Sequence, residues 1–170
     1  YRRVQNWIGS TGTTLEAARF VPPSPEKVAD LMGAWEKYLH GEAPDRLLQL
    51  AILHAEFESI HPFLDGNGRL GRLLITLFLC ERGLLKEPVL YLSLYLKTHR
   101  RRYYELLQAV RETGDWESWL AFFLEGVHLT AHQASVTAGT ILPLFERDTA
   151  RLTNLGRSAN SAIRVHQLLQ

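Results

Sequence analysis

Two helical patterns are joined by the segment His61-Pro62-Phe63-Leu64-Asp65-Gly66-Asn67-Gly68-Arg69-Leu70-Gly71-Arg72. Before it, apolar residues recur at helical spacing from Pro44 to about Ile60, and after it an apolar pattern runs from Gly68 to about Arg82. Pro62 disfavours helical geometry at the residue before it, so we expect the first helix to end at His61. A simple connection between helices needs glycine, but not a histidine, a carboxylate and two arginines as well. The segment therefore predicts a helical fold with a chemical site at this connection.

The rest of the chain is mostly helical in pattern. Ser24-Pro25-Glu26 supplies an N-cap, a first-turn proline and an early acid, and apolar residues follow at helical spacing to Leu39. One or two helices are expected from Ser93 to about Thr113, and Asp115 caps a further long one. The stretch from Val4 to Val21 differs, because strand formers flank a loop rich in glycine and threonine. We expect an all-α domain with one small N-terminal β-hairpin at about residues 4–21.

Composition limits the classes of function. The 170 residues are 46% apolar, enough for one globular domain with a real core. There are 19 basic and 18 acidic side chains, so no overall field attracts nucleic acid or an acidic membrane. The apolar run from Leu73 to Cys80 is too short to span a bilayer. Cys80 is the single cysteine, which excludes an internal disulfide and suits a reducing compartment. No targeting segment is found, and we expect a cytoplasmic protein without membrane association.

The glycines of the segment predict an anion-binding loop. Gly66, Gly68 and Gly71 fit the dinucleotide pattern GxGxxG, and the stretch from Gly66 to Arg72 narrowly misses a phosphate-binding P-loop. Both patterns should follow a buried strand, whereas this one follows a helical pattern, so neither fold is expected. The physics common to such loops remains: glycine lets backbone N–H groups approach phosphate oxygens, and the helix that starts near Gly68 directs its positive end at them.

The other side chains of the segment fit transfer chemistry on a bound nucleotide. Asp65 is the one carboxylate beside the glycines and is the expected ligand of Mg²⁺, which binds one or two carboxylates together with phosphate oxygens. Arg69 and Arg72 are suited to the outer phosphates. The imidazole of His61 can accept a proton from an incoming hydroxyl near neutral pH. Together these groups predict in-line attack of a hydroxyl on phosphorus.

The segment resembles the signature of the Fic family, HPFx(D/E)GNGRxxR, and matches it at every defined position. The resemblance extends to residues 57–60, to residues 90–93 and to Tyr103-Tyr104. It implies a Fic-type helical bundle with the hairpin as a flap, and Mg²⁺-dependent transfer of AMP from ATP to a Ser, Thr or Tyr hydroxyl of a protein. It assigns the role of general base to His61 and of metal ligand to Asp65. The nucleotide-binding residues that it implies are Asp65, Gly66, Asn67, Gly68, Arg69, Gly71, Arg72 and Tyr103.

Details of the resemblance bear on specificity and control. Fic relatives that act as kinases carry lysine at the position of Gly68, so glycine here implies transfer of AMP with release of pyrophosphate. Lys97 and His99 stand near positions where relatives often carry asparagine, which leaves the base preference open. No inhibitory S/TxxxEG/N pattern is found, and residues 121–126 come closest. An inhibitory helix would then come from upstream of Tyr1 or from another chain, and a homodimer is left open.

The resemblance also implies a domain boundary and leaves alternatives. We expect a catalytic domain at residues 1–155 and a helical extension at 156–170 that leads toward a winged-helix domain. The hairpin would align a target segment by strand addition, or would be only a lid. Besides adenylyl transfer, a regulatory module that holds nucleotide without useful transfer remains an alternative, as does removal of AMP by the same residues. His128 and His132 have the spacing of metal ligands, but a surface or packing role is favoured. His54 is expected to be a satisfied interior histidine.

Overall fold

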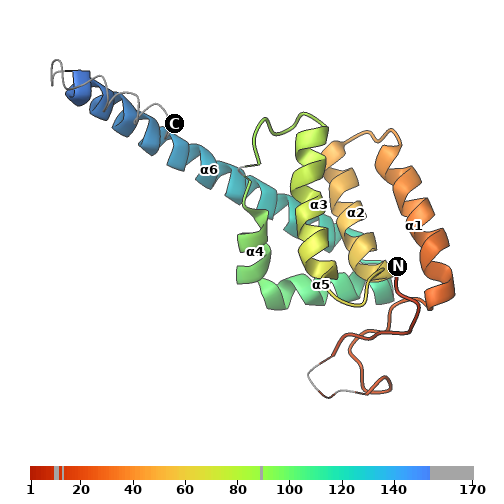
Figure 1. Ribbon diagram of the computed structural model, residues 1–170. Coiled ribbons are helices and arrows are strands. Elements are labelled where there is room, and N and C mark those ends of the chain that lie inside the picture. The colour runs from red at the N-terminus through yellow and green to blue at the C-terminus, as the bar shows by residue number, and fades with distance from the viewer. Residues whose placement is uncertain (10–11, 13, 89, 154–170) are drawn as a thin grey trace. The chain divides into compact units, whose positions relative to one another are not determined.

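The computed structural model describes residues 1–9, 12, 14–88 and 90–153, and its regular structure is helical (Figure 1). No strand is found in this part of the chain, which confirms the predicted all-α class. None of its helices combines the length and the apolar character needed to cross a bilayer. The helices are α1 (Pro25–His40), α2 (Arg46–Ile60), α3 (Asn67–Glu81), α4 (Leu92–Thr98), α5 (Arg100–Thr113) and α6 (Trp116–Thr153).

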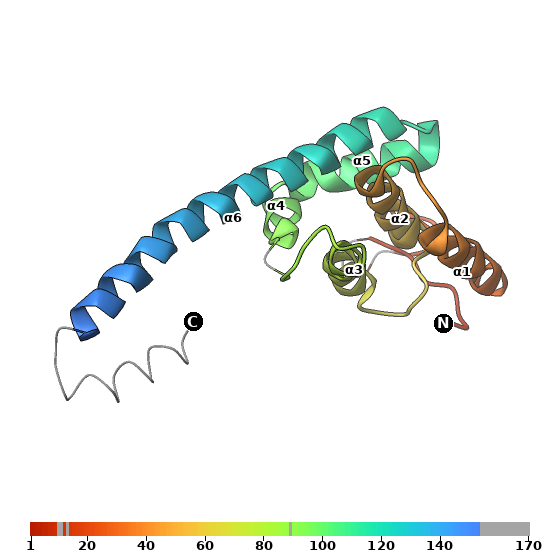
Figure 2. The same cartoon turned by 90° about the horizontal axis from the view of Figure 1, so that it is seen from above.

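Helix α2 is the central element of the bundle. It packs against α1, α3 and α5, and Figures 1 and 2 show it between α1 and α3. Asp45 caps its start, because Oδ1 of Asp45 accepts hydrogen bonds from the backbone N–H groups of Leu47 and Leu48 at 2.8 and 2.9 Å. Most α2 side chains are buried, including the polar Gln49, His54 and Glu58. A helix surrounded in this way can carry the polar groups of a site into the core.

The main core is formed by α2, α3, α4, α5 and the start of α6. Trp119 and Phe123, near the start of α6, are fully buried and pack with apolar residues of α2, α3, α4 and α5. The indole Nε1–H of Trp119 donates a 2.9 Å hydrogen bond to the backbone carbonyl of Ala51, so this large side chain is buried without an unpaired donor. A smaller cluster of Val28, Met32, Phe57 and Ile60 joins α1 to the end of α2, and Phe63 of the loop packs against it.

The expected N-terminal hairpin is not found as a pair of strands. In the described part of residues 4–21, Ile8 and Phe20 form one isolated antiparallel bridge, with backbone hydrogen bonds of 2.8 and 3.2 Å. Val4, Trp7 and Val21 are largely exposed, so little apolar burial supports a longer ladder. The segment is attached to the bundle by side chains instead: the ring of Phe20 lies under the guanidinium of Arg111, 3.8 Å from its Cζ atom.

The chain divides into two compact units, residues 1–130 and residues 131–170. The first unit contains α1 to α5, the start of α6 and the whole segment from His61 to Arg72. The described part of the second unit is the remainder of α6, which contains Pro143. The domain boundary expected after residue 155, and the extension expected at residues 156–170, lie outside the described residues.

Candidate active site

The loop begins at His61, which has an uncommon backbone conformation. Helix α2 ends at Ile60, and His61 then adopts left-handed dihedral angles, φ 50° and ψ 61°. This places the helix end where Pro62 predicts it. A non-glycine residue in this region is strained by about 1 kcal/mol, so the surrounding contacts must hold it. The chain therefore turns sharply at the residue expected to be the general base.

Hydrogen bonds from Arg2 stabilise this turn. Its side chain is only 4% exposed. Its Nε donates to the His61 carbonyl at 3.0 Å, its backbone N–H donates to the Pro62 carbonyl at 2.8 Å, and its guanidinium also donates to Pro23 and Ile60 carbonyls. The sequence gives no sign of this role, because the arginine stands 59 residues before His61 and belongs to no motif.

Replacing Arg2 with methionine is expected to lower the free energy of unfolding by about 2 kcal/mol, because several buried carbonyls lose their donors. Methionine preserves most of the apolar stem. Urea unfolding measures the change, with the exposed neighbour Arg3→Met as the matched control. Equal stability of the two variants would show that Arg2 does not hold the turn.

Asn67 closes the loop from its other end. Its side chain is buried, its Oδ1 accepts from the Phe63 backbone N–H at 2.9 Å, and its Nδ2 donates to the Phe63 carbonyl at 2.8 Å. The amide thus satisfies both backbone groups of Phe63. The side chain of Asn67 is occupied by the loop itself, so any contact of this residue with a phosphate would come from its backbone N–H.

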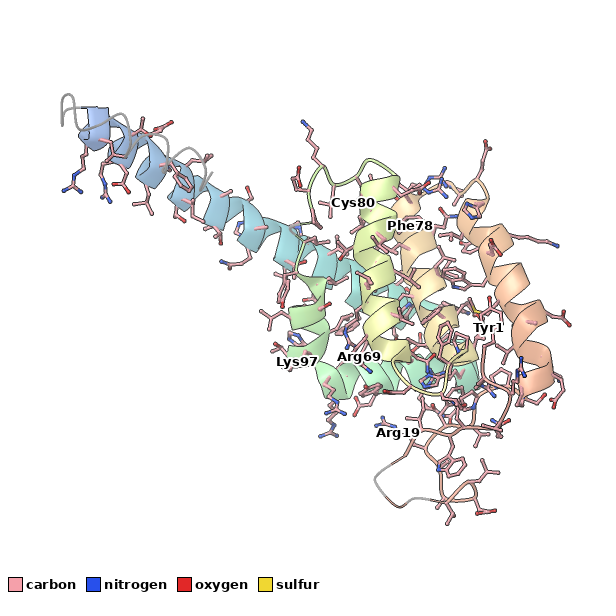
Figure 3. All side chains as sticks on the ribbon, viewed as in Figure 1. Tyr1, Arg19, Arg69, Phe78, Cys80 and Lys97 are labelled. Carbon is pink, nitrogen blue, oxygen red and sulfur yellow. The ribbon has the colours of Figure 1, made fainter. Side chains whose placement is uncertain are left out.

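The start of α3 is open to an anion. The N-cap residue is Gly66, in the left-handed conformation with φ 83°, and no side chain caps the helix. The first N–H groups of a helix have no partner within the helix, and they carry its positive dipole. Helix α3 begins at Asn67, one residue before the start expected from sequence. Figure 3 shows Arg69 at this end of α3 and Cys80 toward the other end.

Asp65 and Arg69 form an exposed ion pair at this terminus. Nη2 of Arg69 lies 3.0 Å from Oδ2 of Asp65, and the two side chains are 75% and 91% exposed. A pair this exposed contributes little free energy, so either partner can exchange it for another ligand. One exposed carboxylate beside a helix N-terminus fits the way Mg²⁺ is bound, through one or two carboxylates together with phosphate oxygens.

A cleft of about 450 Å³ adjoins the N-terminal part of α3 and brings together two residues expected at the site, Arg72 and Tyr103. Lys97 and Arg100 add positive charge to its lining, and none of the described residues that line it is acidic. Aromatic surface comes from Tyr91, Tyr103 and Tyr104. Basic groups beside aromatic faces suit a ligand with phosphates and a planar base. Lys97 faces this cleft, whereas His99 contributes to a different hollow and bonds the Tyr95 carbonyl at 3.0 Å.

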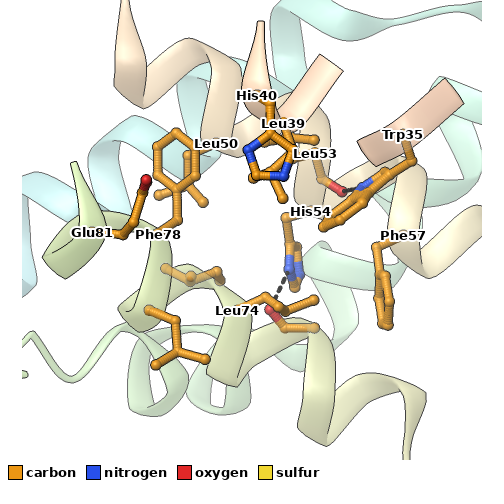
Figure 4. A pocket seen from close by; sticks show the side chains of 13 residues that line it. Trp35, Leu39, His40, Leu50, Leu53, His54, Phe57, Leu74, Phe78 and Glu81 are labelled. Atoms are coloured by element: carbon orange, nitrogen blue, oxygen red, sulfur yellow. Dashed lines mark hydrogen bonds between the residues drawn. The ribbon is translucent and has the colours of Figure 1, made fainter. Parts of the chain in front are cut away.

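His54 links the motif helix to the wall of this cleft. Its Nδ1 lies 3.2 Å from the Gly71 carbonyl, drawn in Figure 4, and its Nε2 lies 2.9 Å from the Tyr103 hydroxyl. A carbonyl only accepts, so Nδ1 carries the proton and Nε2 accepts from Tyr103. Both ring nitrogens are satisfied, which confirms the expected interior role. Burial, the largest cause, lowers the pKa of His54 to about 4, so the ring is neutral at pH 7.

The neutral state of His54 has a measurable consequence for stability. Its folded pKa lies below its ordinary value of 6.5, so its contribution is full above pH 6.5 and is lost as the pH falls to about 4. The amide of His54→Gln preserves a donor and an acceptor but does not ionise. As the pH falls from 6.5 to about 4, we expect the free energy of unfolding of this variant to rise by about 3 kcal/mol relative to that of the wild type. Urea unfolding at several pH values measures it. A difference that does not change with pH would contradict the buried neutral state.

Gly71 lies at the closest approach of α3 to α2. A Cβ atom built there would stand 2.6 Å from Oε1 of Glu58 and 3.3 Å from both the His54 ring and the Phe57 ring. The structure therefore places Gly71 in the interface between the helices. An apolar cavity of about 200 Å³ adjoins this point between α1, α2 and α3, with Trp35, Leu50 and Phe78 among its lining residues (Figure 4).

The imidazole of His61 is half-buried. Burial lowers its pKa, the Glu58 backbone carbonyl opposes this, and the positive charges of Arg111 and Arg2 lower it further. Nδ1 is buried and makes no hydrogen bond in the described structure. His61 is therefore neutral near pH 7. His128 and His132 do not belong to a candidate metal site, because the described residues contain no group of three potential metal ligands.

Comparison with known proteins agrees with this geometry. The sequence model of the Fic/DOC family matches residues 1–79. "Protein adenylyltransferase Fic" of Culex quinquefasciatus is 33% identical over 128 residues, which are 74% of this chain and 22% of that protein. A probable protein adenylyltransferase of Aquifex aeolicus is 45% identical over 69 residues, which are 40% of this chain and 22% of that protein. A crystal structure of a Fic family protein from Desulfovibrio desulfuricans G20 superposes with a TM-score of 0.71 at 28% identity, over 81% of this chain and 41% of that one.

The fold and the loop thus define a helical domain in which a helix without a side-chain cap begins shortly after a histidine–proline turn. The chain belongs to the Fic/DOC family. It spans about a fifth of the length of the curated relatives that it matches.

Proposed function

We propose that residues 1–155 form the catalytic domain of a protein adenylyltransferase, which transfers AMP from ATP to a Ser, Thr or Tyr hydroxyl of a target protein. The observation that carries the proposal is the uncapped N-terminus of α3, which follows His61 in the same loop and is followed within the helix by Arg72, a lining residue of the basic cleft. Relatives named as protein adenylyltransferases support the same activity.

In this proposal the phosphates lie along the start of α3. The backbone N–H groups of Gly66, Asn67 and Gly68 bind the α- and β-phosphates, and the guanidinium of Arg72 binds the γ-phosphate. Gly68 leaves room for that guanidinium, because a Cβ atom at this position would stand 3.2 Å from Nη1 of Arg72. Arg69 contributes further positive charge. The base and ribose occupy the cleft along Tyr103 and Lys97.

His61 accepts the proton of the target hydroxyl. Its Nδ1 is buried, so the other ring nitrogen, Nε2, takes this role. The hydroxyl oxygen forms a bond to the α-phosphorus while the bond from that phosphorus to the oxygen bridging to the β-phosphate breaks. Pyrophosphate leaves with the electron pair, and the hydroxyl proton resides on the imidazole. The N–H groups of the helix terminus stabilise charge on the α-phosphate as the bond forms.

Asp65 would hold Mg²⁺ in exchange for its pairing with Arg69. A bound Mg²⁺ neutralises phosphate charge and favours departure of pyrophosphate. Release of Arg69 from Asp65 would free its guanidinium for the phosphates at the same time. The exposed position of the carboxylate leaves room for the water ligands that Mg²⁺ retains.

The segment around the Ile8–Phe20 bridge is the proposed docking place for the target. Val4 and Val21 are 58% and 43% exposed, and the segment is attached to the bundle through Arg2 and Phe20. An extended target segment could add backbone hydrogen bonds at this exposed edge. Such docking would bring a hydroxyl toward the turn at His61, which Arg2 holds.

The activity is tested with ATP labelled on its α-phosphorus, Mg²⁺ and a cell lysate. The proposal predicts a protein band that carries label from the α-phosphate and none from the γ-phosphate. Label from γ-labelled ATP would indicate phosphate transfer instead. Binding of ATP without any labelled band would contradict the transferase and favour a regulatory nucleotide-binding module.

A further inference from the structure

Glu58 is a buried acid that the proposed reaction does not use. It lies in the last turn of α2 and is 5% exposed. Its Oε1 is buried and has no hydrogen-bond partner among the described residues. An unpaired buried carboxylate is costly, so a protein that retains one has a use for its charge or its proton.

The carboxylate lies against the two motif glycines of α3. The point where a Cβ atom on Gly68 would stand is 3.8 Å from Oε1 of Glu58 and 3.2 Å from Nη1 of Arg72. A Cβ atom on Gly71 would stand 2.6 Å from the same oxygen. The glycines thus allow an acid of α2 to approach the base of the phosphate-binding terminus. Glu58 and Arg72 thus approach the same position beside Gly68, and Arg72 lines the basic cleft.

The guanidinium groups of Arg72 and Arg111 offset the charge of Glu58. The two side chains differ in how many other contacts hold them. Arg111 of α5 donates to the Ser59 hydroxyl at 3.0 Å and to the Glu58 backbone carbonyl at 3.2 Å, and it lies over the Phe20 ring. Arg72 forms no ion pair and no side-chain hydrogen bond in the described structure, and it lines the cleft. Arg111 is therefore fixed, whereas Arg72 is available to a phosphate.

Other ionisable groups face the same place. His54 and His61 flank Glu58 on the α2 side, and Tyr103 faces it from α5, where burial and then the charge of Glu58 raise the pKa of the phenol. Burial, partly offset by Arg72 and Arg111, raises the pKa of Glu58 to about 7. Burial lowers the pKa of both histidines and so disfavours their charged forms beside Glu58.

We propose that Glu58 sets how tightly Arg72 holds the outer phosphate, because its carboxylate and the γ-phosphate compete for the same guanidinium charge. This inference rests on the proposed function in one respect, the assignment of Arg72 to the outer phosphate. Ionised Glu58 weakens the binding of a triphosphate, and protonated Glu58 does not. AMP has no outer phosphate and is insensitive to the state of Glu58.

The test compares Glu58→Gln with wild type by calorimetric titration of the full chain with ATP and with AMP, both in the presence of Mg²⁺. At pH 8 the variant is expected to bind ATP about fivefold more tightly, and at pH 6 the two proteins should agree within about twofold. AMP affinity should not change. Glu56→Gln is the matched control, since Glu56 lies on the same helix, is half-buried and faces Arg111 rather than Arg72.

A double-mutant cycle identifies Arg72 as the mediator. In an Arg72→Ala background, Glu58→Gln should no longer change ATP affinity. Glu58→Met serves as a second neutral variant, and circular dichroism checks that each protein is folded. An equal effect on ATP and AMP, an equal effect of Glu56→Gln, or no effect at pH 8 would overturn the inference.

These outcomes are separate from those of the proposed function. A chain that binds ATP through Arg72 with the predicted dependence on Glu58, yet labels no protein, would refute the transferase and leave the inference standing. A chain that transfers AMP, but whose ATP affinity does not depend on Glu58, would refute the inference and leave the proposed transferase standing.

Discussion

Replacing His61 with alanine is expected to reduce transfer of the α-label by about 10³-fold while leaving ATP affinity within about twofold. The imidazole is proposed to contact the hydroxyl, so its loss removes the proton acceptor without removing any phosphate contact. Initial rates of protein labelling and calorimetric titration with ATP measure the two quantities. His128→Ala is the matched control, because His128 is an exposed histidine of α6.

The pH dependence of the same reaction gives an independent check on His61. Its pKa is lowered by burial, so kcat at saturating ATP should fall in acid, below the ordinary histidine pKa of 6.5. This decrease in acid should be absent in His61→Ala. A variant that retains wild-type rates, or one that loses activity only because it no longer binds ATP, would contradict the role of general base.

Replacing Gly71 with alanine is expected to cost about 3 kcal/mol of unfolding free energy, together with most of the activity. The added methyl group would stand 2.6 Å from the Glu58 carboxylate and 3.3 Å from two rings of α2, so α3 must shift away from α2. That shift displaces the helix terminus proposed to bind the phosphates. Urea unfolding and label transfer measure the two losses.

Gly33→Ala is the matched control for this substitution. Gly33 lies inside α1, and a Cβ atom there would meet nothing within 4 Å. Alanine at such a helical position should stabilise the protein by about 0.5–1 kcal/mol. Wild-type stability in Gly71→Ala would mean that α2 and α3 do not approach as closely as described.

The helical frame could be predicted because its boundaries are encoded locally. Pro62 marks the end of α2, and Ser24-Pro25 marks the start of α1, where the structure has them. Periodic apolar residues gave the all-α class. The strand formers between Val4 and Val21 gave a hairpin, but strand pairing depends on burial and partners that the local sequence does not specify, and one bridge is found.

The residues of the loop could be found by their chemistry, whereas their supports could not. His61, Asp65 and the glycines stand together in the sequence. Arg2 reaches the loop from the start of the chain, and Arg111 reaches Glu58 from α5. These contacts depend on how distant segments pack. Asn67 is expected among the nucleotide-binding residues, but the sequence does not show that its side-chain amide is paired with the backbone of Phe63.

A crystal structure with a non-hydrolysable ATP analogue and Mg²⁺ would show whether residues 61–72 bind the triphosphate as proposed. We expect the α-phosphate at the backbone N–H groups that open α3, within reach of the His61 imidazole, with the outermost phosphate on Arg72 and the metal on Asp65. A triphosphate bound in the reverse direction, or bound away from residues 61–72, would contradict this expectation.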